Sequence, residues 1–459
     1  MKELAVEYVK DCQAPNQLVV EKRDPQELAK LLDLTLPTKG VGAQVWNPRF
    51  MDKLYAATNP VGVLSELFLG LVNANNHVYH VSPVFTLMEV TTARKLGIMF
   101  GYPSDTCGGI TNPGGSMSNM VAVVTARNHL FPELKAKGLS GGPRLSMFVS
   151  QQSHYSFLKA AFTAGIGTDH VISVPCNALG QMEPQALEDN ILASRNRGEV
   201  PFFVAATAGT TVMGAFDPME AIADIAARFN LWFHVDGSWG GSIIFSKSYG
   251  HLMRGAGKSD SLTVNPHKLL GVPLQCSYLL IRDKSILNQS NTTCAQYLFH
   301  GDEWDLGNGS LGCGRRPDAV KLFLAWKYFG TEGFDQRLTT AFKNAQYLAN
   351  LVKFRSPRFR LVADPASFNV CFWYIPTTLA HLETQDPQGF TNRLGEVTRT
   401  LHGALLATNT FMLDYSPVDI GDTTLPDFFR AICNSPSLGK RDLDFLVNEL
   451  ERLGKELYP

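Results

Sequence analysis

The sequence has no long apolar run, no paired cysteines and no concentration of positive charge. None of its apolar runs reaches the roughly 18 residues of a membrane-spanning helix. Its 41 basic and 42 acidic residues give a formal net charge of -1, which argues against nucleic acid or an anionic membrane as the main partner. The eight cysteines form no Cys-x-x-Cys pair, so neither a zinc site nor a disulfide framework is indicated. The acidic residues near its start are unlike a secretory signal. We therefore expect a cytoplasmic protein with reduced thiols and no metal site.

The chain does contain enough apolar sequence for a large core. It has 459 residues, of which 45% are hydrophobic, and this length exceeds one ordinary domain. Residues 1–48 carry short apolar helical patterns divided by prolines, which predict a helical N-terminal arm. Residues 49–330 alternate helical patterns with short apolar strands and predict a large α/β domain. Residues 331–459 predict a small α+β domain that ends in an amphipathic helix.

The predicted strands of the large domain are apolar along their whole length. Such strands, alternating with helices, are typical of a mostly parallel sheet covered on both faces. Ligands of such sheets bind at the carboxyl ends of the strands. The six strands that we predict are 145–149, 170–174, 202–206, 231–235, 261–264 and 277–281.

One lysine lies just past a predicted strand end. The strand at 261–264 leads into Asn265, Pro266, His267 and Lys268. Lysine at such a place is a candidate for a Schiff base with a carbonyl cofactor, although a lysine beside a proline, taken alone, also fits a solvated loop.

Four more motifs, at strand ends or at a helix start, contain residues that could bind a cofactor. Asp236 ends another strand and could pair with a pyridinium nitrogen, although alone it also fits a helix N-cap. Gly115 and Ser116 open a helix whose free N–H groups could bind a phosphate. This segment lacks the lysine of a Walker loop, so a nucleotide is not the expected anion. His154 and Thr211 each follow a strand, where a histidine could stack on a flat ring and a threonine could bond its edge.

These motifs, in this order, resemble the fold-type I enzymes that use pyridoxal 5'-phosphate (PLP). The similarity is closer to their group II decarboxylases, which include glutamate, cysteine sulfinate and aromatic amino-acid decarboxylases. It is carried by Asn-Pro-His-Lys at 265–268, His-Val-Asp at 234–236, Gly-Gly-Ser-Met-Ser-Asn at 114–119 and Asp-Phe-Phe-Arg at 427–430, and it covers roughly residue 45 to the end. The resemblance implies the aspartate aminotransferase-like fold and is strongest toward the glutamate and cysteine sulfinate decarboxylase branch.

The resemblance also implies roles for individual residues. Lys268 should carry the aldimine, Asp236 should pair with the pyridine nitrogen, and His154 should stack on the ring, so that these three form the catalytic set. Family members commonly share their sites between two subunits, so we expect a homodimer. The cofactor-binding residues implied are Gly115, Ser116, His154, Thr211, Asp236, Ser238, Asn265, His267 and Lys268.

The substrate expected from this branch is a small acidic amino acid: glutamate, aspartate or cysteine sulfinate. Arg430 is the candidate clamp for the side-chain acid, because arginine binds a carboxylate through two parallel hydrogen bonds; the alternative is a structural salt bridge. Lys53, where relatives usually have glutamine, would also favour an anion, and Asn75 and His77 fall where the branch varies with substrate. The alternatives are an aromatic amino-acid decarboxylase, an aldehyde-forming PLP enzyme or a non-catalytic homologue.

One departure from the family concerns a proton donor. Relatives carry a loop tyrosine that is thought to protonate the quinonoid carbon, whereas here the aromatic residue in about that place is Trp304. Another acid, such as His154 or water, would then have to supply the proton.

Overall fold

The computed structural model describes residues 46–55, 57–293, 295, 297–299 and 304–459. The predicted N-terminal arm, residues 1–48, lies almost entirely outside this range. The chain divides into two compact units, which are described separately. One contains residues 58–339 with 419–422, and the other contains residues 46–57, 340–418 and 423–459 among those described. None of the helices in the described ranges is both long and apolar enough to cross a membrane.

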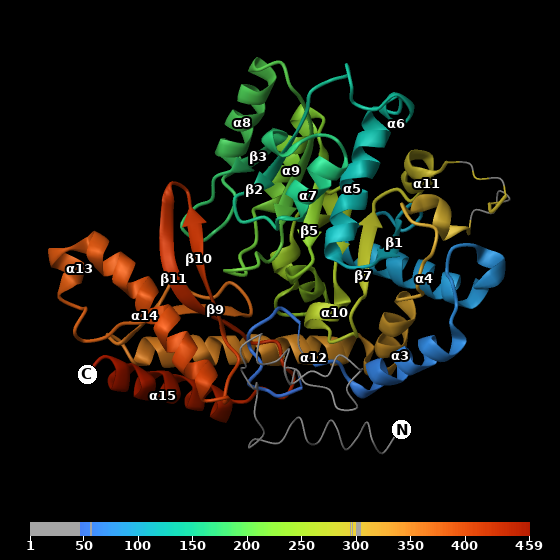
Figure 1. Ribbon diagram of the computed structural model, residues 1–459. Helices are drawn as coiled ribbons and strands as arrows, with labels where there is room; N and C mark the ends of the chain where they lie inside the picture. The colour runs from blue at the N-terminus through green and yellow to red at the C-terminus, as the bar shows by residue number, and fades with distance from the viewer. Residues whose placement is uncertain (1–45, 56, 294, 296, 300–303) are drawn as a thin grey trace, which may run out of the picture. The chain divides into compact units, whose positions relative to one another are not determined.

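The larger unit is built on a seven-stranded sheet (Figure 1). All ladders from β6 through β5, β4 and β2 to β3 are parallel, and only β7 runs in the opposite direction, between β1 and β6. The prediction of a mostly parallel sheet is therefore confirmed. In sheet order the strands are β1 (Gly108–Asn112), β7 (Ser277–Ile281), β6 (Ser261–Val264), β5 (Trp232–Gly237), β4 (Val200–Thr207), β2 (Leu145–Ser150) and β3 (Val171–Val174).

Both faces of this sheet are covered, because every residue of β2, β5, β6 and β7 is buried. Packing of α5 against α7 and α11 forms one helical group, and α8 packs on α9. Burial of residues that point to both faces explains why these strands are continuously apolar. The helices of this unit are α3 (Pro60–Val72), α4 (Pro83–Phe100), α5 (Gly115–Leu130), α6 (Leu134–Lys137), α7 (Ser156–Thr163), α8 (Pro184–Asn196), α9 (Met219–Phe229), α10 (Pro266–Leu269) and α11 (Ser285–Asn291).

The first strand, β1, was not predicted from the sequence. Its residues Gly108 and Gly109 have weak strand propensity. A Cβ at Gly109 would lie 2.3 Å from the main-chain oxygen of Leu279 on β7, so glycine is required for the two strands to approach this closely.

The smaller unit holds a four-stranded sheet with helices, in agreement with the α+β fold predicted for the C-terminal sequence. Its order is β10 (Asp414–Ile420), β11 (Thr423–Ile432), β9 (Asn369–Tyr374) and β8 (Phe359–Leu361). The helices are α13 (Leu382–Gln385), α14 (Pro387–Ala407) and α15 (Lys440–Leu457). In α15, the predicted amphipathic helix, Leu443, Leu446, Leu450 and Leu453 are buried, whereas Leu457 is exposed. The long helix α12 (Ala319–Phe354) contributes residues 319–339 to the larger unit and the rest to the smaller one. It begins earlier than predicted and breaks at Gly330, where φ is 67°.

Candidate active site

The predicted strand-end residues of the larger unit line one cavity of about 210 Å³. They come from the start of α5, from the segments after β2 and β4, from the end of β5 and from the α10 turn after β6. These positions lie at the carboxyl edge of parallel strands, as the topology requires. The lining residues are Gly115, Ser116, Asn119, His154, Tyr155, Thr207, Gly209, Thr211, Asp236, Ser238, Trp239, Asn265, His267 and Lys268.

Lys268 is the only lysine among the residues that line this cavity. It lies in the short helix α10, which Pro266 begins and which directly follows β6. Burial lowers the pKa of Lys268 to about 8, against the opposing effect of the Asp236 carboxylate. Near neutral pH the unprotonated fraction of its amine is therefore much larger than in an ordinary lysine, and the unprotonated amine is the form that can attack a carbonyl.

Asp236 is a buried carboxylate with well-defined donors. Its Oδ1 accepts a hydrogen bond from the Ser238 N–H at 3.0 Å, and its Oδ2 accepts one from Asn119 Nδ2 at 2.8 Å. Burial alone would raise the pKa of Asp236, but the hydrogen bonds from Ser238, the neighbouring His234 and the hydrogen bond from Asn119 bring it below its usual value. The carboxylate is therefore held ionised inside the protein.

The start of α5 forms a cradle. Gly114 caps the helix with φ of 93°, a conformation that side-chain-bearing residues rarely adopt. A Cβ at Gly115 would lie 2.6 Å from both Asn265 Nδ2 and Ser238 Oγ, so the site depends on the absence of a side chain there. Within the described part of the chain, the buried Asn265 Oδ1 has no hydrogen-bond partner. First-turn N–H groups of the helix, with these polar side chains, suit an anionic group.

His154 has a defined tautomer. Its Nδ1 accepts a hydrogen bond from the Ser156 N–H at 3.2 Å, so a neutral ring carries its proton on Nε2. Burial lowers the pKa of His154, which favours this neutral form. The ring of Tyr155 lies 4.2 Å from the His154 ring, centroid to centroid. His267 also lines the cavity, but its Nδ1 contacts the main-chain oxygen of Cys276 at 2.7 Å, which fixes the α10 turn.

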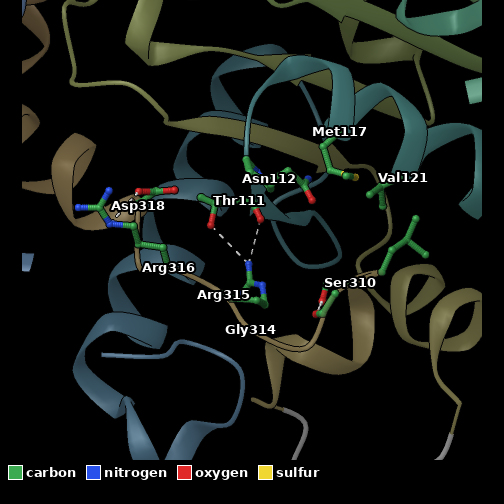
Figure 2. A pocket seen from close by; sticks show the side chains of 12 residues that line it. Thr111, Asn112, Met117, Val121, Ser310, Gly314, Arg315, Arg316 and Asp318 are labelled. Carbon is green, nitrogen blue, oxygen red and sulfur yellow. Dashed lines mark hydrogen bonds and ion pairs between the residues drawn. The ribbon is translucent and has the colours of Figure 1, made fainter. Parts of the chain in front are cut away.

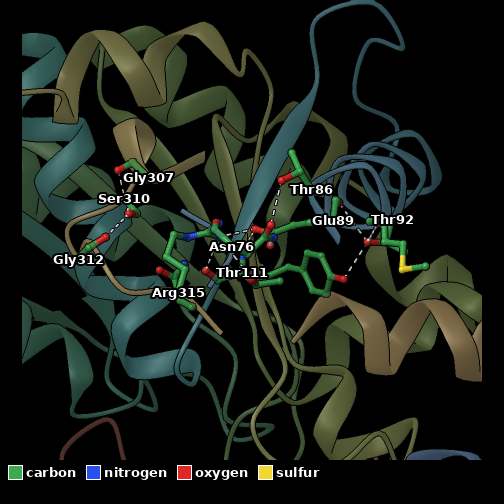
Figure 3. Close-up of polar contacts among 12 residues, drawn as sticks. Asn76, Thr86, Glu89, Thr92, Thr111, Gly307, Ser310, Gly312 and Arg315 are labelled. Atoms are coloured by element: carbon green, nitrogen blue, oxygen red, sulfur yellow. Dashed lines mark hydrogen bonds and ion pairs between the residues drawn. The ribbon is translucent and has the colours of Figure 1, made fainter. Parts of the chain in front are cut away.

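A buried ion pair anchors the strand that leads into the cradle. Figure 3 shows Arg315 paired with Glu89, while Glu89 Oε1 also accepts a hydrogen bond from the Thr111 N–H at 2.7 Å. Arg315 donates to the main-chain oxygens of Asn76, at 2.8 Å, and Thr111, at 3.1 Å. These bonds hold the end of β1 immediately before the cradle. Arg315 also lines a second cavity, of about 330 Å³, together with Thr111, Asn112 and Pro113 (Figure 2).

The predicted substrate residues are not among those that line the Lys268 cavity. Asn75 Oδ1 accepts a hydrogen bond from the Arg315 N–H at 2.9 Å, and His77 Nδ1 lies 3.3 Å from the Asn75 main-chain oxygen. Lys53 and Arg430 belong to the smaller unit, where both pair with Asp414.

Trp304 lines a further cavity, of about 590 Å³, with its ring centroid 6.1 Å from that of Tyr79. Residues 300–303, which precede it, lie outside the described part of the chain.

Two polar residues of the Lys268 cavity were not singled out from the sequence. Asn119 lies one turn into α5, and its side chain reaches Asp236, 117 positions further along the chain. Thr207 is the last residue of β4 and pairs in register with Asp236; its buried Oγ1 has no hydrogen-bond partner among the described residues. A polar residue at the end of an apolar strand is the signal that could have identified Thr207.

The fold and the site together define a class. A mostly parallel sheet, a lysine of lowered pKa, an ionised carboxylate and an anion cradle on one cavity are the parts of an enzyme that holds a phosphorylated pyridine cofactor. Residues 21–375 match the family described as the pyridoxal-dependent decarboxylase conserved domain. The chain belongs to this family, and it is a PLP-dependent amino-acid decarboxylase of fold-type I and group II.

Solved structures agree with this assignment. Mouse CSAD, of the cysteine sulfinate/glutamate branch, is 36% identical over 98% of both chains, with TM-scores of 0.90 without ligand and 0.91 in a second structure. Rice (Oryza sativa) TDC, solved with PLP and tryptamine, is 24% identical over all of this chain and 96% of its own, with a TM-score of 0.88. Rhodiola rosea 4-hydroxyphenylacetaldehyde synthase is 22% identical over all of this chain and 97% of its own, with a TM-score of 0.84. The last two show the shared fold alone.

Proposed function

We propose that this enzyme decarboxylates a small acidic L-amino acid, with cysteine sulfinate, aspartate and glutamate as the candidate substrates. The observation that carries the proposal is the 36% identity to mouse CSAD over nearly the whole chain. The aromatic amino-acid enzymes of the same fold are only 22–24% identical. Two of the cations of the smaller unit, Lys53 and Arg430, could bind an anionic side chain, which an apolar aromatic substrate lacks.

The residues of the Lys268 cavity fit PLP. The cofactor phosphate would bind at the start of α5, where Gly115 and Ser116 offer N–H groups and Asn265 offers a side-chain amide. The ring nitrogen would pair with Asp236, and His154 would cover the ring. Thr211, Ser238 and His267 also line the cavity.

When bound, PLP supplies an electron-withdrawing ring that accepts the electron pair left as carbon dioxide departs. The chain's own residues would do the rest. Lys268 Nζ would attach the cofactor and be released by exchange with the substrate amine. Asp236, being ionised, would hold a proton on the ring nitrogen. The candidate donor to the carbon that loses the carboxylate is a water held by the Nε2 proton of neutral His154, or His154 itself as the imidazolium, which would return to the neutral ring after giving up its proton.

Attachment of PLP to the cofactor-free protein should depend on pH. The pKa of Lys268 is lowered to about 8, and only the neutral amine attacks a carbonyl. The rate of attachment should therefore rise as pH increases through about 8, and it should level off above that value. An unperturbed lysine would show its midpoint near pH ~10.4. Stopped-flow absorbance between pH 6 and 10 measures this rate. A midpoint near 10 would contradict the assignment of Lys268 as a buried amine.

Arg430 lies in a cluster of two cations and two carboxylates. Its side chain is 8% exposed, pairs with Asp414, and donates to the Asp52 main-chain oxygen at 3.2 Å. Lys53 contacts Asp52 at 3.1 Å and Asp414 at 3.4 Å. Burial and the nearby Asp414 raise the pKa of Asp52. A substrate acid bound by Arg430 would therefore compete with Asp414 for the same guanidinium.

This competition can be tested with a pair of variants, one at Arg430 and one at Asp414. Arg430→Met should raise KM for the acidic substrate by roughly 10- to 100-fold, the range of a hydrogen bond to a charged group, with a smaller change in kcat. Asp414→Asn should leave that KM unchanged or lower it, because it removes the competing charge. Steady-state kinetics, with thermal unfolding as the control for folding, separates the outcomes. If both variants lose stability and neither changes KM, Arg430 forms only a structural salt bridge.

We also propose that the enzyme is a homodimer. Helices α3 and α4 of the larger unit expose large apolar side chains, among them Leu71 at 85%, Leu64 at 61% and Val84 at 59%. They border an apolar groove of about 570 Å³ lined by Phe68 and Val84, among others. Contiguous apolar surface of this kind is typical of a subunit interface.

Leu71→Glu tests this interface. A buried, unpaired glutamate at a subunit contact should shift the sedimenting mass from twice the chain mass to the 50.5 kDa chain itself. Leu192→Glu, at a leucine 45% exposed on α8, is the matched control and should remain dimeric. Sedimentation velocity gives the result. A Leu71→Glu dimer as stable as the control would place the interface elsewhere, and a monomeric wild type would refute the dimer.

A further inference from the structure

A buried hydrogen-bond chain runs from the core of the sheet to Asp236. Trp232 Nε1 lies 2.8 Å from Ser261 Oγ, and Ser261 Oγ lies 2.8 Å from His234 Nδ1. His234 Nε2 lies 3.3 Å from Asn119 Oδ1, and Asn119 Nδ2 lies 2.8 Å from Asp236 Oδ2. All five side chains are less than 5% exposed. These hydrogen bonds therefore link an indole on β5, through buried side chains, to the carboxylate that lines the cofactor cavity.

The groups at the two ends of this hydrogen-bond chain, Trp232 and Asp236, indicate that every hydrogen bond is donated in the direction from Trp232 toward Asp236. The indole of Trp232 can only donate, so Ser261 Oγ accepts there and has its own hydrogen free for His234 Nδ1. A neutral His234 that accepts at Nδ1 carries its proton on Nε2 and donates to the amide oxygen of Asn119. At the other end, an ionised Asp236 can only accept.

Reversing the direction of these hydrogen bonds would bring two acceptors into contact. If His234 carried its proton on Nδ1, the bare Nε2 would face the Asn119 oxygen at 3.3 Å, an acceptor against an acceptor, and only the Thr263 hydroxyl, at the long distance of 3.4 Å, could donate to it. Rotating the Asn119 amide to relieve this contact would turn its oxygen toward the Asp236 carboxylate. It would also lose the bond from Asn119 Nδ2 to Ser156 Oγ, at 3.0 Å. With the proton of His234 on Nε2, each of these buried groups is satisfied, and Asn119 Nδ2 donates to the Asp236 carboxylate, which favours the ionised form.

We propose that Ser261 and Trp232 are positioning residues, which act through His234 and Asn119 to orient the Asp236 carboxylate and keep it ionised. Neither Ser261 nor Trp232 lines the cofactor cavity, so they act at a distance. Burial lowers the pKa of His234 to about 4, in keeping with a neutral ring that relays direction and does not carry charge. The effect on the cofactor rests on the proposed pairing of Asp236 with the ring nitrogen. The direction of the hydrogen bonds from Trp232 to Asp236 does not depend on that pairing.

The first test measures the tautomer of His234 in the cofactor-free protein by ¹⁵N nuclear magnetic resonance of labelled histidine. The wild type should show a proton on Nε2 and a bare Nδ1 that accepts a hydrogen bond. Ser261→Ala should shift the Nδ1 resonance toward that of a free imidazole nitrogen, and Trp232→Phe should shift it less. A wild-type His234 protonated at Nδ1 would overturn the proposal without any reference to PLP.

The second test measures the dissociation constant of PLP. Ser261→Ala should weaken binding by about 3- to 10-fold, the fold-change of one neutral hydrogen bond. Ser146→Ala is the matched control, because Ser146 is also fully buried on a strand of this sheet and its Oγ bonds to Ser194 Oγ at 2.7 Å. Equal affinities of Ser261→Ala and Ser146→Ala would overturn the relay, provided that Asp236→Asn weakens binding. If Asp236→Asn binds PLP as tightly as the wild type does, Asp236 does not pair with the cofactor. The direction of the hydrogen bonds is then tested only by the tautomer of His234.

Discussion

Lys268→Ala is expected to give a colourless protein without decarboxylase activity. Removal of the only lysine of the cavity removes the amine to which the cofactor attaches, so the visible absorption of bound PLP should disappear. The rate of carbon dioxide release should fall by more than about 10³-fold, as happens when a covalent catalytic group is lost. Absorption spectra and a carbon dioxide assay on purified protein measure both effects.

Lys258→Ala is the control for this variant, because Lys258 is half-exposed and pairs with Asp224 on the surface of the same unit. It should keep the colour and the activity of the wild type. A Lys268→Ala protein that retains the visible band would show that another lysine holds the cofactor. A colourless wild type, after incubation with PLP, would contradict the account of the whole cavity.

Asp236→Asn is expected to have the second largest effect. The amide keeps the shape of the side chain but cannot hold a proton on the ring nitrogen of PLP. The ring would then withdraw electrons less strongly, and kcat should fall by about 10²- to 10³-fold, the cost of losing one preorganised electrostatic contact. PLP should also dissociate more readily. Steady-state kinetics and fluorescence titration of PLP measure these changes.

Asp260→Asn provides a matched comparison. Asp260 is also mostly buried beside β5, where it accepts a hydrogen bond from the Phe233 N–H at 2.8 Å, but it does not line the cavity. Its variant should lose some stability and keep its kcat. Equal losses of kcat in the two variants would mean that Asp236 acts only by supporting the fold.

The sequence predicted the sheet and the members of the Lys268 cavity well, for one physical reason. Strands buried on both faces must be apolar, so polar residues that follow them mark the carboxyl edge where ligands bind. His154, Asp236 and Lys268 were found in this way before any geometry was known. The cofactor class followed because these residues occur in one order along one sheet, and the family match confirms it.

The parts that were not predicted depend on contacts between distant residues. Strand β1 exists because Gly109 can approach β7 closely, which no local propensity indicates. Asn119 reads as an ordinary polar position of a helix, and its role in holding Asp236 becomes visible only in three dimensions. The sequence likewise did not predict that Asp414 pairs with Arg430. The two residues lie on neighbouring strands of the small sheet, and the pairing of those strands was not predicted.

We propose above that this PLP-dependent decarboxylase acts on a small acidic amino acid. The most direct measurement is carbon dioxide release by the PLP-loaded wild type from cysteine sulfinate, aspartate, glutamate and tryptophan under identical conditions. We expect kcat/KM for at least one acidic substrate to exceed that for tryptophan by more than about 100-fold, since a carboxylate clamp discriminates by roughly the energy of its charged hydrogen bonds. Equal or faster turnover of tryptophan would contradict it.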